Sequence, residues 1–169
     1  MKQTIIFLDF DGSIAHSPEP ETGRAEYLAK TGKPFPHIGW WSKDASLNLD
    51  VFDIKLIESV DAVFQKASKD PAYKTVLLTN RQYKMESAVR KVLDHHNYKM
   101  DLYTFKSGVE NKGNRIVNIL QMPQFKDVTD AEFYDDDAIH LDDAERCMLG
   151  SKVSLKLFLV KDGNIVPYN

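Results

Sequence analysis

The segment from residue 5 to residue 13 constrains the fold more than any other part of the chain. It reads IIFLDFDGS, so an apolar run ends in two aspartates separated by one residue and is followed at once by a glycine. An apolar run without polar alternation is typical of a strand that is covered on both faces. Acids at the carboxyl end of such a strand lie where open α/β sheets bind their ligands. One carboxylate there can serve as a nucleophile or metal ligand, and the other as a proton donor.

Strand-like and helical segments alternate along most of the chain. Apolar runs predict strands, and apolar residues at helical spacing predict helices. Strands are expected at residues 4–8, 75–79, 101–105, 131–134 and 154–160, helices at 53–68, 85–95, 111–120 and 141–149, and a hairpin return at 165–166. This order predicts an α/β fold: a Rossmann-like, doubly wound, mostly parallel sheet of about five strands with helices on both faces.

The segment from about residue 15 to residue 50 has no clear periodicity and is rich in proline and glycine. Pro18, Pro20, Gly23, Gly32, Pro34, Pro36 and Gly39 fall within it. Such a composition predicts a long irregular excursion with one short helix at residues 24–30. Loops of this length are commonly functional. We therefore expect residues 1–169 to form a single domain in which this segment is a small cap or insert, either a mobile lid or a fixed wall.

Composition bounds the remaining choices. With 169 residues and a formal net charge of −3, the chain is most simply one domain without bulk electrostatic affinity for nucleic acid. The single cysteine, Cys147, excludes an intramolecular disulfide and fits a reducing compartment. No apolar run approaches the roughly 20 residues that cross a bilayer. The sequence predicts a soluble, cytoplasmic protein with no membrane association and no evident obligate protein partner.

Polar residues follow several of the predicted strands. Asp9 and Asp11 follow the first, Thr79 and Asn80 end the second, and the acids at 135–137 end the fourth. The carboxyl ends of parallel strands meet at one edge of a sheet, so these groups should share a crevice. Clustered carboxylates require a neutralising cation, and hard oxygen ligands suit Mg²⁺ better than zinc. A lysine there, Lys106 or Lys112, would offset the charge of a phosphoryl group.

In its polar strand ends and their order along the sequence, the chain resembles the haloacid dehalogenase-like (HAD) phosphohydrolase superfamily. Its four motifs are matched in order by DFDGSI at residues 9–14, VLLTNR at 76–81, Lys112 ahead of a helix, and FYDDD at 133–137. Serine stands at position 13, where threonine is commoner. The resemblance covers nearly the whole chain, and it implies a HAD-like fold and phosphoryl chemistry.

The resemblance also implies roles for individual residues. Asp9 would attack phosphorus and become an aspartyl-phosphate, while Asp11 would protonate the leaving oxygen and later take a proton from water. Mg²⁺ would be held by Asp9, by the backbone carbonyl of Asp11, and by Asp136. The phosphoryl group would be bound by Gly12, Thr79, Asn80 and Lys112, of which Thr79 and Lys112 also count as catalytic.

Three positions leave the assignment open. Many members carry a second acid four residues after the metal-binding aspartate, and here that place holds His140, so Asp135 or Asp137 would have to supply the carboxylate. Lys106 lies nearer to a strand end than Lys112 does. Arg81 could reach a substrate phosphate or pair with a carboxylate.

A narrower likeness concerns the Swiss Army Knife RNA repair-like group of this superfamily. PHIGWWS at residues 36–42 and DDAIH at 136–140 resemble its Pro…Trp segment and its histidine after the fourth motif. This likeness implies the phosphorylated ends of nucleic acids or nucleotides as substrates.

The sequence therefore favours a Mg²⁺-dependent phosphatase acting on a phosphomonoester, whether a nucleotide, a nucleic-acid end or a small metabolite. One alternative is a catalytically silent HAD-fold binding or regulatory module. Another is a phosphotransferase, which the sequence does not separate from a hydrolase. Dehalogenation is less favoured, because Asp11 and the acidic cluster point to phosphoryl chemistry.

Overall fold

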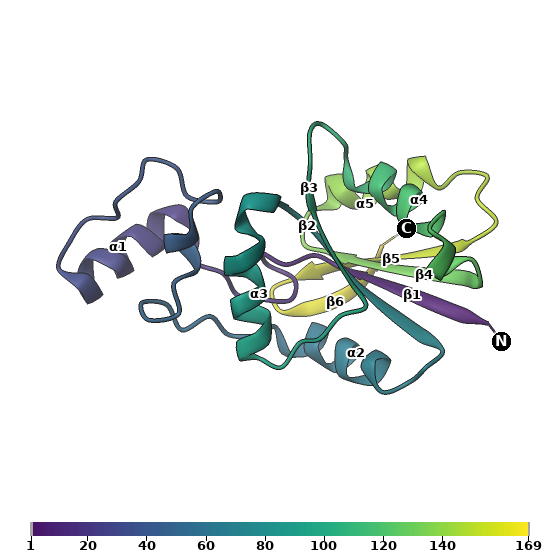
Figure 1. Cartoon of the computed structure of the whole chain (residues 1–169), viewed down its shortest axis with the longest axis horizontal. Coiled ribbons are helices and arrows are strands. Elements are labelled where there is room, and N and C mark those ends of the chain that lie inside the picture. The colour runs from purple at the N-terminus through teal and green to yellow at the C-terminus, as the bar shows by residue number, and fades with distance from the viewer. Residues whose placement is uncertain (1, 169) are drawn as a thin grey trace.

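A six-stranded sheet forms the centre of the computed structural model, which describes residues 2–168 (Figure 1). The strands are β1 (Gln3–Leu8), β2 (Tyr73–Gln82), β3 (Leu102–Lys106), β4 (Val128–Asp135), β5 (Ser154–Lys161) and β6 (Asn164–Tyr168). Their order across the sheet is β3-β2-β1-β4-β5-β6, with parallel neighbours except for the antiparallel pair β5–β6. The predicted sheet is confirmed, and its sixth strand is the hairpin return expected at 165–166.

Helices cover both faces of the sheet. The chain forms the helices α1 (Pro20–Thr31), α2 (Glu58–Ser68), α3 (Glu86–His95), α4 (Lys112–Leu120) and α5 (Ala138–Cys147), with short 3-10 helices η1 (Asp44–Leu47), η2 (Tyr83–Met85) and η3 (Pro123–Phe125). In Figure 1, α2 and α3 lie on one side of the sheet and α4 and α5 on the other. None of the helices in the described part of the chain is both long and apolar enough to span a membrane.

The two helical layers explain the apolar run at the start of the chain. Ile6 and Leu8 of β1 belong to the core cluster that contains residues of α2 and α3. Ile5 and Phe7 belong to the cluster that contains residues of α4 and α5. Since successive strand residues point to opposite faces, a strand buried on both faces needs an apolar side chain at every position.

The predicted helix at 53–68 begins too early. The chain before α2 is extended and lies beside the segment that follows β1: the amide of His16 donates to the carbonyl of Lys55 (2.8 Å), and that of Ile57 donates to Ile14 (2.9 Å). The apolar residues before Glu58 are buried as expected, but this tertiary pairing overrides their helical spacing.

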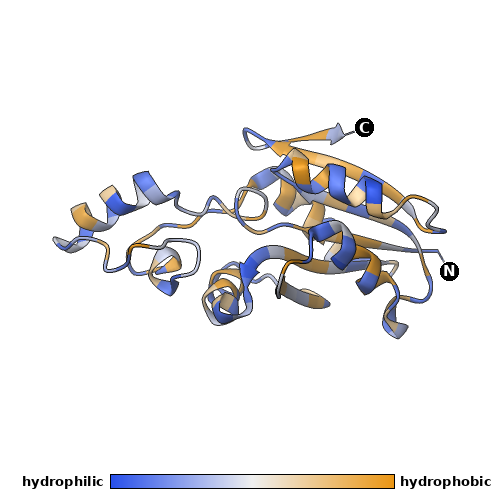
Figure 2. Cartoon of the chain, turned by 90° about the horizontal axis from the view of Figure 1, so that it is seen from above, coloured by the Kyte–Doolittle hydropathy of each residue, from blue (hydrophilic) through white to orange (hydrophobic). Residues whose placement is uncertain are grey.

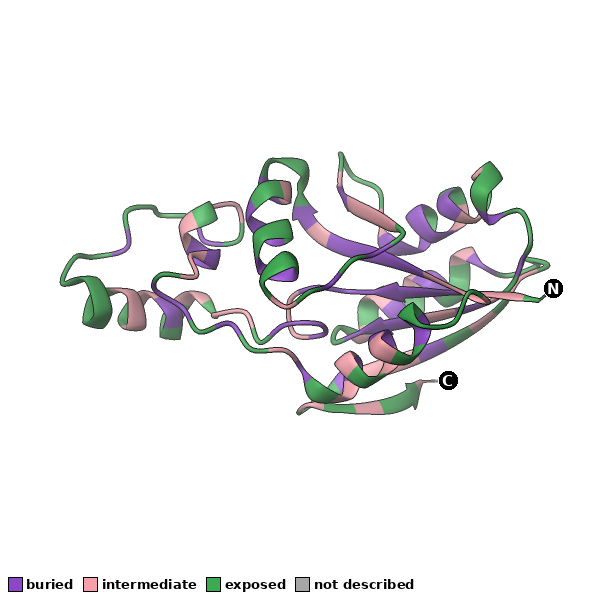
Figure 3. Cartoon of the chain, turned by 60° about the horizontal axis from the view of Figure 1, so that its bottom comes forward, coloured by how far each residue is buried: buried purple, intermediate pink, exposed green. Residues whose placement is uncertain are grey.

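The segment from residue 15 to residue 50 extends from one end of the molecule, with α1 farthest from the sheet (Figures 1 and 2). The helix is longer than the predicted 24–30 because Pro20 occupies its first turn and Gly32, at φ +70°, closes its C-terminus. Figure 3 shows α1 largely exposed, whereas the inner strands β1, β2 and β4 are mostly buried. Trp40 is buried in the same core cluster as Leu8. The division into one domain with a cap stays a prediction.

The strand order determines where a ligand site can lie. From β1 the chain winds outward through β2 and β3 and then crosses back to β4 on the other side of β1. Such a reversal creates a crevice at the carboxyl ends of the two inner strands. Here those ends carry Asp9, directly after β1, and Asp135, the last residue of β4.

Candidate active site

Lys112 connects the two acids at the strand ends. Its Nζ lies 2.7 Å from Oδ1 of Asp9 and 2.6 Å from Oδ2 of Asp135, and its side chain is 1% exposed. Lys106, at the end of β3, lines the same pocket, but its side chain makes no hydrogen bond or salt bridge with the residues described. The geometry therefore places Lys112, rather than Lys106, beside the predicted nucleophile.

Three carboxylates could share a cation at this point. Oxygens of Asp9, Asp135 and Asp136 lie within 4.8 Å of one another. Three ionised carboxylates beside one ammonium leave an excess of negative charge, and an all-oxygen donor set suits Mg²⁺. The residues present thus fit the cofactor that the sequence predicted.

The three acids after β4 have different surroundings. Asp135 is fully buried, and its oxygens already accept hydrogen bonds from Lys112, from the backbone amide of Asp137 and from His140. Asp137 caps α5, where its carboxylate accepts from the amide of Ile139 (2.9 Å). Asp136 has neither engagement and lines the pocket with Asp9, so the pair Asp9 and Asp136 is best placed to ligate a metal directly.

The backbone at Gly12 allows Asp136 to approach. Gly12 has φ +73°, a left-handed conformation that favours glycine, and a Cβ there would lie 2.3 Å from Oδ2 of Asp136. The side chain of Ser13, which is buried, donates to Oδ2 of Asp9 (3.2 Å). The turn after Asp9 therefore shapes the acidic cluster in two ways: Gly12 leaves room for Asp136, and Ser13 donates a hydrogen bond to Asp9.

Burial and the neighbouring charges shift the pKa values of this cluster, upward for Asp9 and Asp136 and downward for Asp135. Burial, together with the neighbouring Asp135 and Asp136, raises the pKa of Asp9 well above that of an ordinary aspartate, although Lys112 opposes this shift. Burial and Asp135 also raise the pKa of Asp136. Burial alone would raise the pKa of Asp135, but Lys112 and His140 together hold it below its usual value. Similarly, Asp9 and Asp135 overcome the effect of burial and raise the pKa of Lys112. Two of the three acids are therefore destabilised as carboxylates, and a bound cation would offset this effect.

His140 links the fourth-motif acids to β2. Its Nδ1 lies 3.1 Å from Asp135, and its Nε2 lies 3.0 Å from the side-chain nitrogen of Asn80. A neutral ring satisfies both contacts when Nδ1–H donates to the carboxylate and Nε2 accepts from the amide. His140, at the position where the resemblance predicted a second acid, therefore contacts Asp135 and Asn80.

The second motif contributes a buried residue and a pocket-lining one. Thr79 is 1% exposed and accepts from the amide of Arg81, whereas Asn80 lines the pocket. Arg115, one turn after Lys112 on α4, donates to the carbonyl of Thr79 (2.7 Å) and so connects α4 to β2. The sequence analysis missed Arg115, although its spacing from Lys112 on one helix face was a usable signal.

Arg81 pairs with a carboxylate, one of the two interpretations left open by the sequence. Its Nη2 lies 2.7 Å from Oδ1 of Asp11, and its Nε lies 2.9 Å from Oδ2. Both residues line the pocket beside Lys112. The residues predicted for nucleophile, acid, lysine and metal site therefore converge on one place in the fold.

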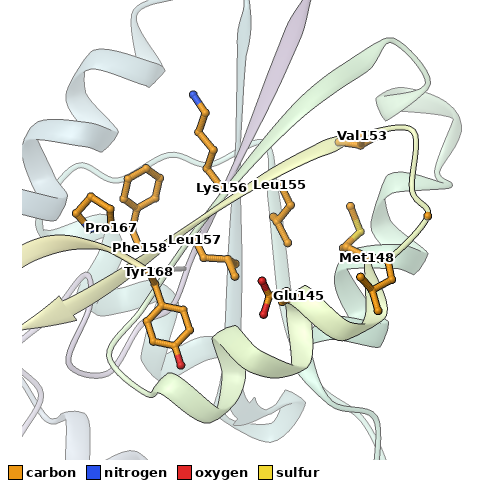
Figure 4. Close-up of a pocket in the computed structure, with 11 residues that line it drawn as sticks. Glu145, Met148, Val153, Leu155, Lys156, Leu157, Phe158, Pro167 and Tyr168 are labelled. Atoms are coloured by element: carbon orange, nitrogen blue, oxygen red, sulfur yellow. The ribbon is translucent and has the colours of Figure 1, made fainter.

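The pocket over these residues has a volume of about 560 Å³. Its wall is also lined by Glu19, Trp41 and Ser42 from the segment 15–50, and by Gln82 and Lys106. A second groove of about 610 Å³ lies between α5 and the strands β5 and β6 (Figure 4). Figure 4 shows the side chain of Lys156, one of its two charged residues, pointing away from the other, Glu145. The first pocket, with its convergent acids and cations, is the candidate active site.

Solved structures share this fold. The HAD domain of the effector protein Lem4 from Legionella pneumophila matches with a TM-score of 0.63 at 18% identity, over 96% of this chain and 88% of that one. An inactive mutant of the same domain gives 0.62 at 19% identity, over 97% and 88%. A HAD-superfamily hydrolase from Ehrlichia chaffeensis gives 0.55 at 12% identity, over 93% and 87%.

These matches establish the architecture. No protein-family model and no curated protein sequence matches the chain. At identities this low, the structural matches show a shared fold and do not carry a function across. The chain has the HAD-like fold that its four motifs predicted. The matches do not single out the Swiss Army Knife RNA repair-like group, so that narrower likeness stays a prediction.

Proposed function

We propose that this protein is a Mg²⁺-dependent phosphatase that hydrolyses a phosphomonoester through an aspartyl-phosphate on Asp9. The observation that carries the proposal is the convergence of Asp9, Lys112 and Asp136 at the switch point of the sheet. A nucleophile, a cation beside it and a carboxylate site for a metal are the parts that phosphoryl transfer requires.

Each residue has a distinct task in the proposed reaction. A carboxylate oxygen of Asp9 attacks phosphorus, the bond from phosphorus to the leaving oxygen breaks, and Asp11 donates a proton to that oxygen. Asp11 then takes a proton from the water that attacks the aspartyl-phosphate, which releases phosphate and restores Asp9. When bound by Asp9, Asp136 and the backbone carbonyl of Asp11, Mg²⁺ supplies a positive charge that offsets the phosphoryl oxygens. Lys112, which lies beside Asp9, would add a second positive charge for the same oxygens.

The wall of the pocket supports a substrate larger than phosphate itself. Trp41 is 42% exposed and offers an aromatic face, and Lys106 adds an ammonium group that no described side chain neutralises. An aromatic face and a cation suit a base next to a phosphate. We propose a nucleotide or a nucleic-acid end as the substrate, with a small phosphorylated metabolite as the alternative.

The test is phosphate release in Mg²⁺ from phenyl phosphate, nucleoside monophosphates, sugar phosphates and 5′- or 3′-phosphorylated oligonucleotides. Asp9→Asn should abolish release, and Asp53→Asn, which changes an exposed acid outside the pocket, should leave it intact. Unchanged turnover in Asp9→Asn would refute the mechanism. Transfer of phosphate to an added alcohol instead of water would identify a phosphotransferase. Binding without turnover by the native chain would identify a silent module.

A further inference from the structure

Arg81 joins three separate parts of the chain. It lies near the end of β2, and its side chain is 2% exposed. Two of its guanidinium nitrogens donate to Asp11, as described above. The third, Nη1, donates to the backbone carbonyl of Trp41 (2.9 Å) and to the hydroxyl of Ser46 (3.1 Å). The guanidinium carbon also lies 5.2 Å from the centroid of the Trp41 ring. All three nitrogens are thus engaged with protein oxygens.

The two-point contact fixes the plane of the Asp11 carboxylate. Parallel N–H···O bonds from a guanidinium restrain rotation of a carboxylate in a way that a single ammonium contact does not. Oδ1 of Asp11 accepts from Nη2 of Arg81 and also from the hydroxyl of Ser17 (2.5 Å). Among the described residues, Oδ2 accepts only from Nε of Arg81. The side chain of Asp11 keeps 23% of its surface exposed, on a residue that lines the pocket. Oδ2 is therefore the oxygen left for proton exchange.

The same guanidinium holds part of the 15–50 segment. Ser46 is fully buried in η1, and its hydroxyl both accepts from Arg81 and donates to the carbonyl of Lys43 (2.8 Å). Trp41, which lines the pocket, is held through its carbonyl and its ring. The wall of the pocket and the acid Asp11 consequently depend on one buried side chain.

We propose that Arg81 is a positioning residue: it orients Asp11 for proton transfer and fastens residues 41–46 beside it as a fixed wall. The proposal rests on the function proposed above, because it assigns Asp11 to the two proton transfers. Arg81 forms and breaks no covalent bond and gives up no proton in either step. Its engagement with Asp11, Trp41 and Ser46 makes it unsuited to be a principal phosphate ligand.

The dependence of the rate on the leaving group tests this role. Phenyl phosphate needs a proton on its leaving oxygen, whereas 2,4-dinitrophenyl phosphate releases an anion that is stable without one. General acid catalysis contributes about 10²–10⁴-fold, so Arg81→Lys should lower kcat/KM for phenyl phosphate by roughly 10–100-fold. For the dinitrophenyl ester the same argument predicts a loss of about threefold or less. A merely structural role would lower both rates equally.

Further variants keep the result interpretable. Ser46→Ala removes one acceptor of Arg81 and is a small truncation, so it should fold even if Arg81→Lys does not. It should show the same dependence on the leaving group, with a smaller loss of kcat/KM. Arg90→Lys changes an exposed arginine paired with Glu86 and should alter neither rate. In the Asp11→Asn background, Arg81→Lys should change the rate with phenyl phosphate by about threefold or less, because both changes remove one function.

Equal losses for the two esters in both Arg81→Lys and Ser46→Ala would overturn the positioning role while leaving the phosphatase proposal intact. Full additivity of Arg81→Lys with Asp11→Asn would overturn it as well. Failure of the underlying function is recognised separately, by turnover that survives in Asp9→Asn or by native protein that releases phosphate from neither ester.

Discussion

Lys112 Nζ lies 2.7 Å from Oδ1 of Asp9, although 103 positions separate the two residues in the sequence. Lys112 begins α4 and Asp9 follows β1, so only the packing of that helix against the sheet brings them together. The same ammonium contacts Asp135, and its 1% exposure means that solvent screens neither contact. A buried cation shared by two acids is costly to remove from a fold, and its position suits a nucleophile that must approach an anionic phosphoryl group.

Replacing Lys112 should abolish turnover. Loss of one electrostatic donor to the transition state costs about 10²–10³-fold in kcat, so Lys112→Met should reduce phosphate release by at least that factor. The fold should also lose stability, because removing one partner of a buried ion pair costs roughly 3–5 kcal/mol. Activity assays and thermal melts measure the two effects separately.

Lys106→Met is the matched control for this prediction. Its ammonium has no carboxylate partner among the described side chains, so the melting temperature should hardly change. Turnover of phenyl phosphate should persist. A severe loss in Lys106→Met together with a mild one in Lys112→Met would reverse the assignment of the catalytic lysine.

Magnesium should stabilise the protein in a pH-dependent way. The folded pKa values of Asp9 and Asp136 lie above their ordinary value, so protonation favours the fold and metal-free protein loses stability as pH rises through those values. Asp135 acts oppositely: its lowered pKa contributes stability that is lost as the pH falls. Mg²⁺ competes with protons for Asp9 and Asp136. At about 100 times its Kd it should add about 2.7 kcal/mol near neutral pH, and less in acid.

Thermal melts with Mg²⁺ and with EDTA across pH measure this effect without any substrate. Asp136→Asn should remove the Mg²⁺-dependent rise in melting temperature, whereas Asp53→Asn, in an exposed salt bridge with Lys55, should retain it. A rise that is unchanged in Asp136→Asn, or one that grows as the pH falls, contradicts the placement of the metal.

His140 should affect metal affinity and turnover through its contact with Asp135. His140→Phe keeps a ring of similar size but loses the contacts to Asp135 and Asn80. Residues that orient acids next to a metal typically contribute about 10–100-fold in metal affinity or activity, and we expect a loss in this range. The Mg²⁺ concentration that gives half-maximal turnover measures it. His95→Phe, an exposed change on α3, is the control. Equal Mg²⁺ requirements in both variants would argue against a supporting role.

Much of this arrangement was predictable from the sequence because local patterns carry it. An apolar run that ends in acids identifies β1 and β4 with their polar ends, and parallel topology then requires those ends to meet. What the sequence misplaced or left open was set by tertiary contact. The start of α2 depends on pairing with the chain near Ile14, and the choice of Lys112 over Lys106 depends on how α4 packs. The partner of Arg81 lies 70 positions away, which periodicity within a segment does not reveal.

Gly12 separates backbone strain from damage to the acidic cluster. Gly12→Ala places a Cβ at φ +73° and 2.3 Å from Oδ2 of Asp136, so both the backbone and the carboxylate must move. Gly32→Ala meets similar strain at φ +70° but no heavy atom within 4 Å. A left-handed conformation costs a residue with a Cβ roughly 1–2 kcal/mol, so both variants should melt at a lower temperature. Only Gly12→Ala should also weaken the Mg²⁺-dependent rise in melting temperature and reduce turnover, since only there does the new methyl group displace Asp136. If the two alanine variants lose stability equally and both keep the full response to Mg²⁺, then Asp136 is not a metal ligand in the position where the fold holds it.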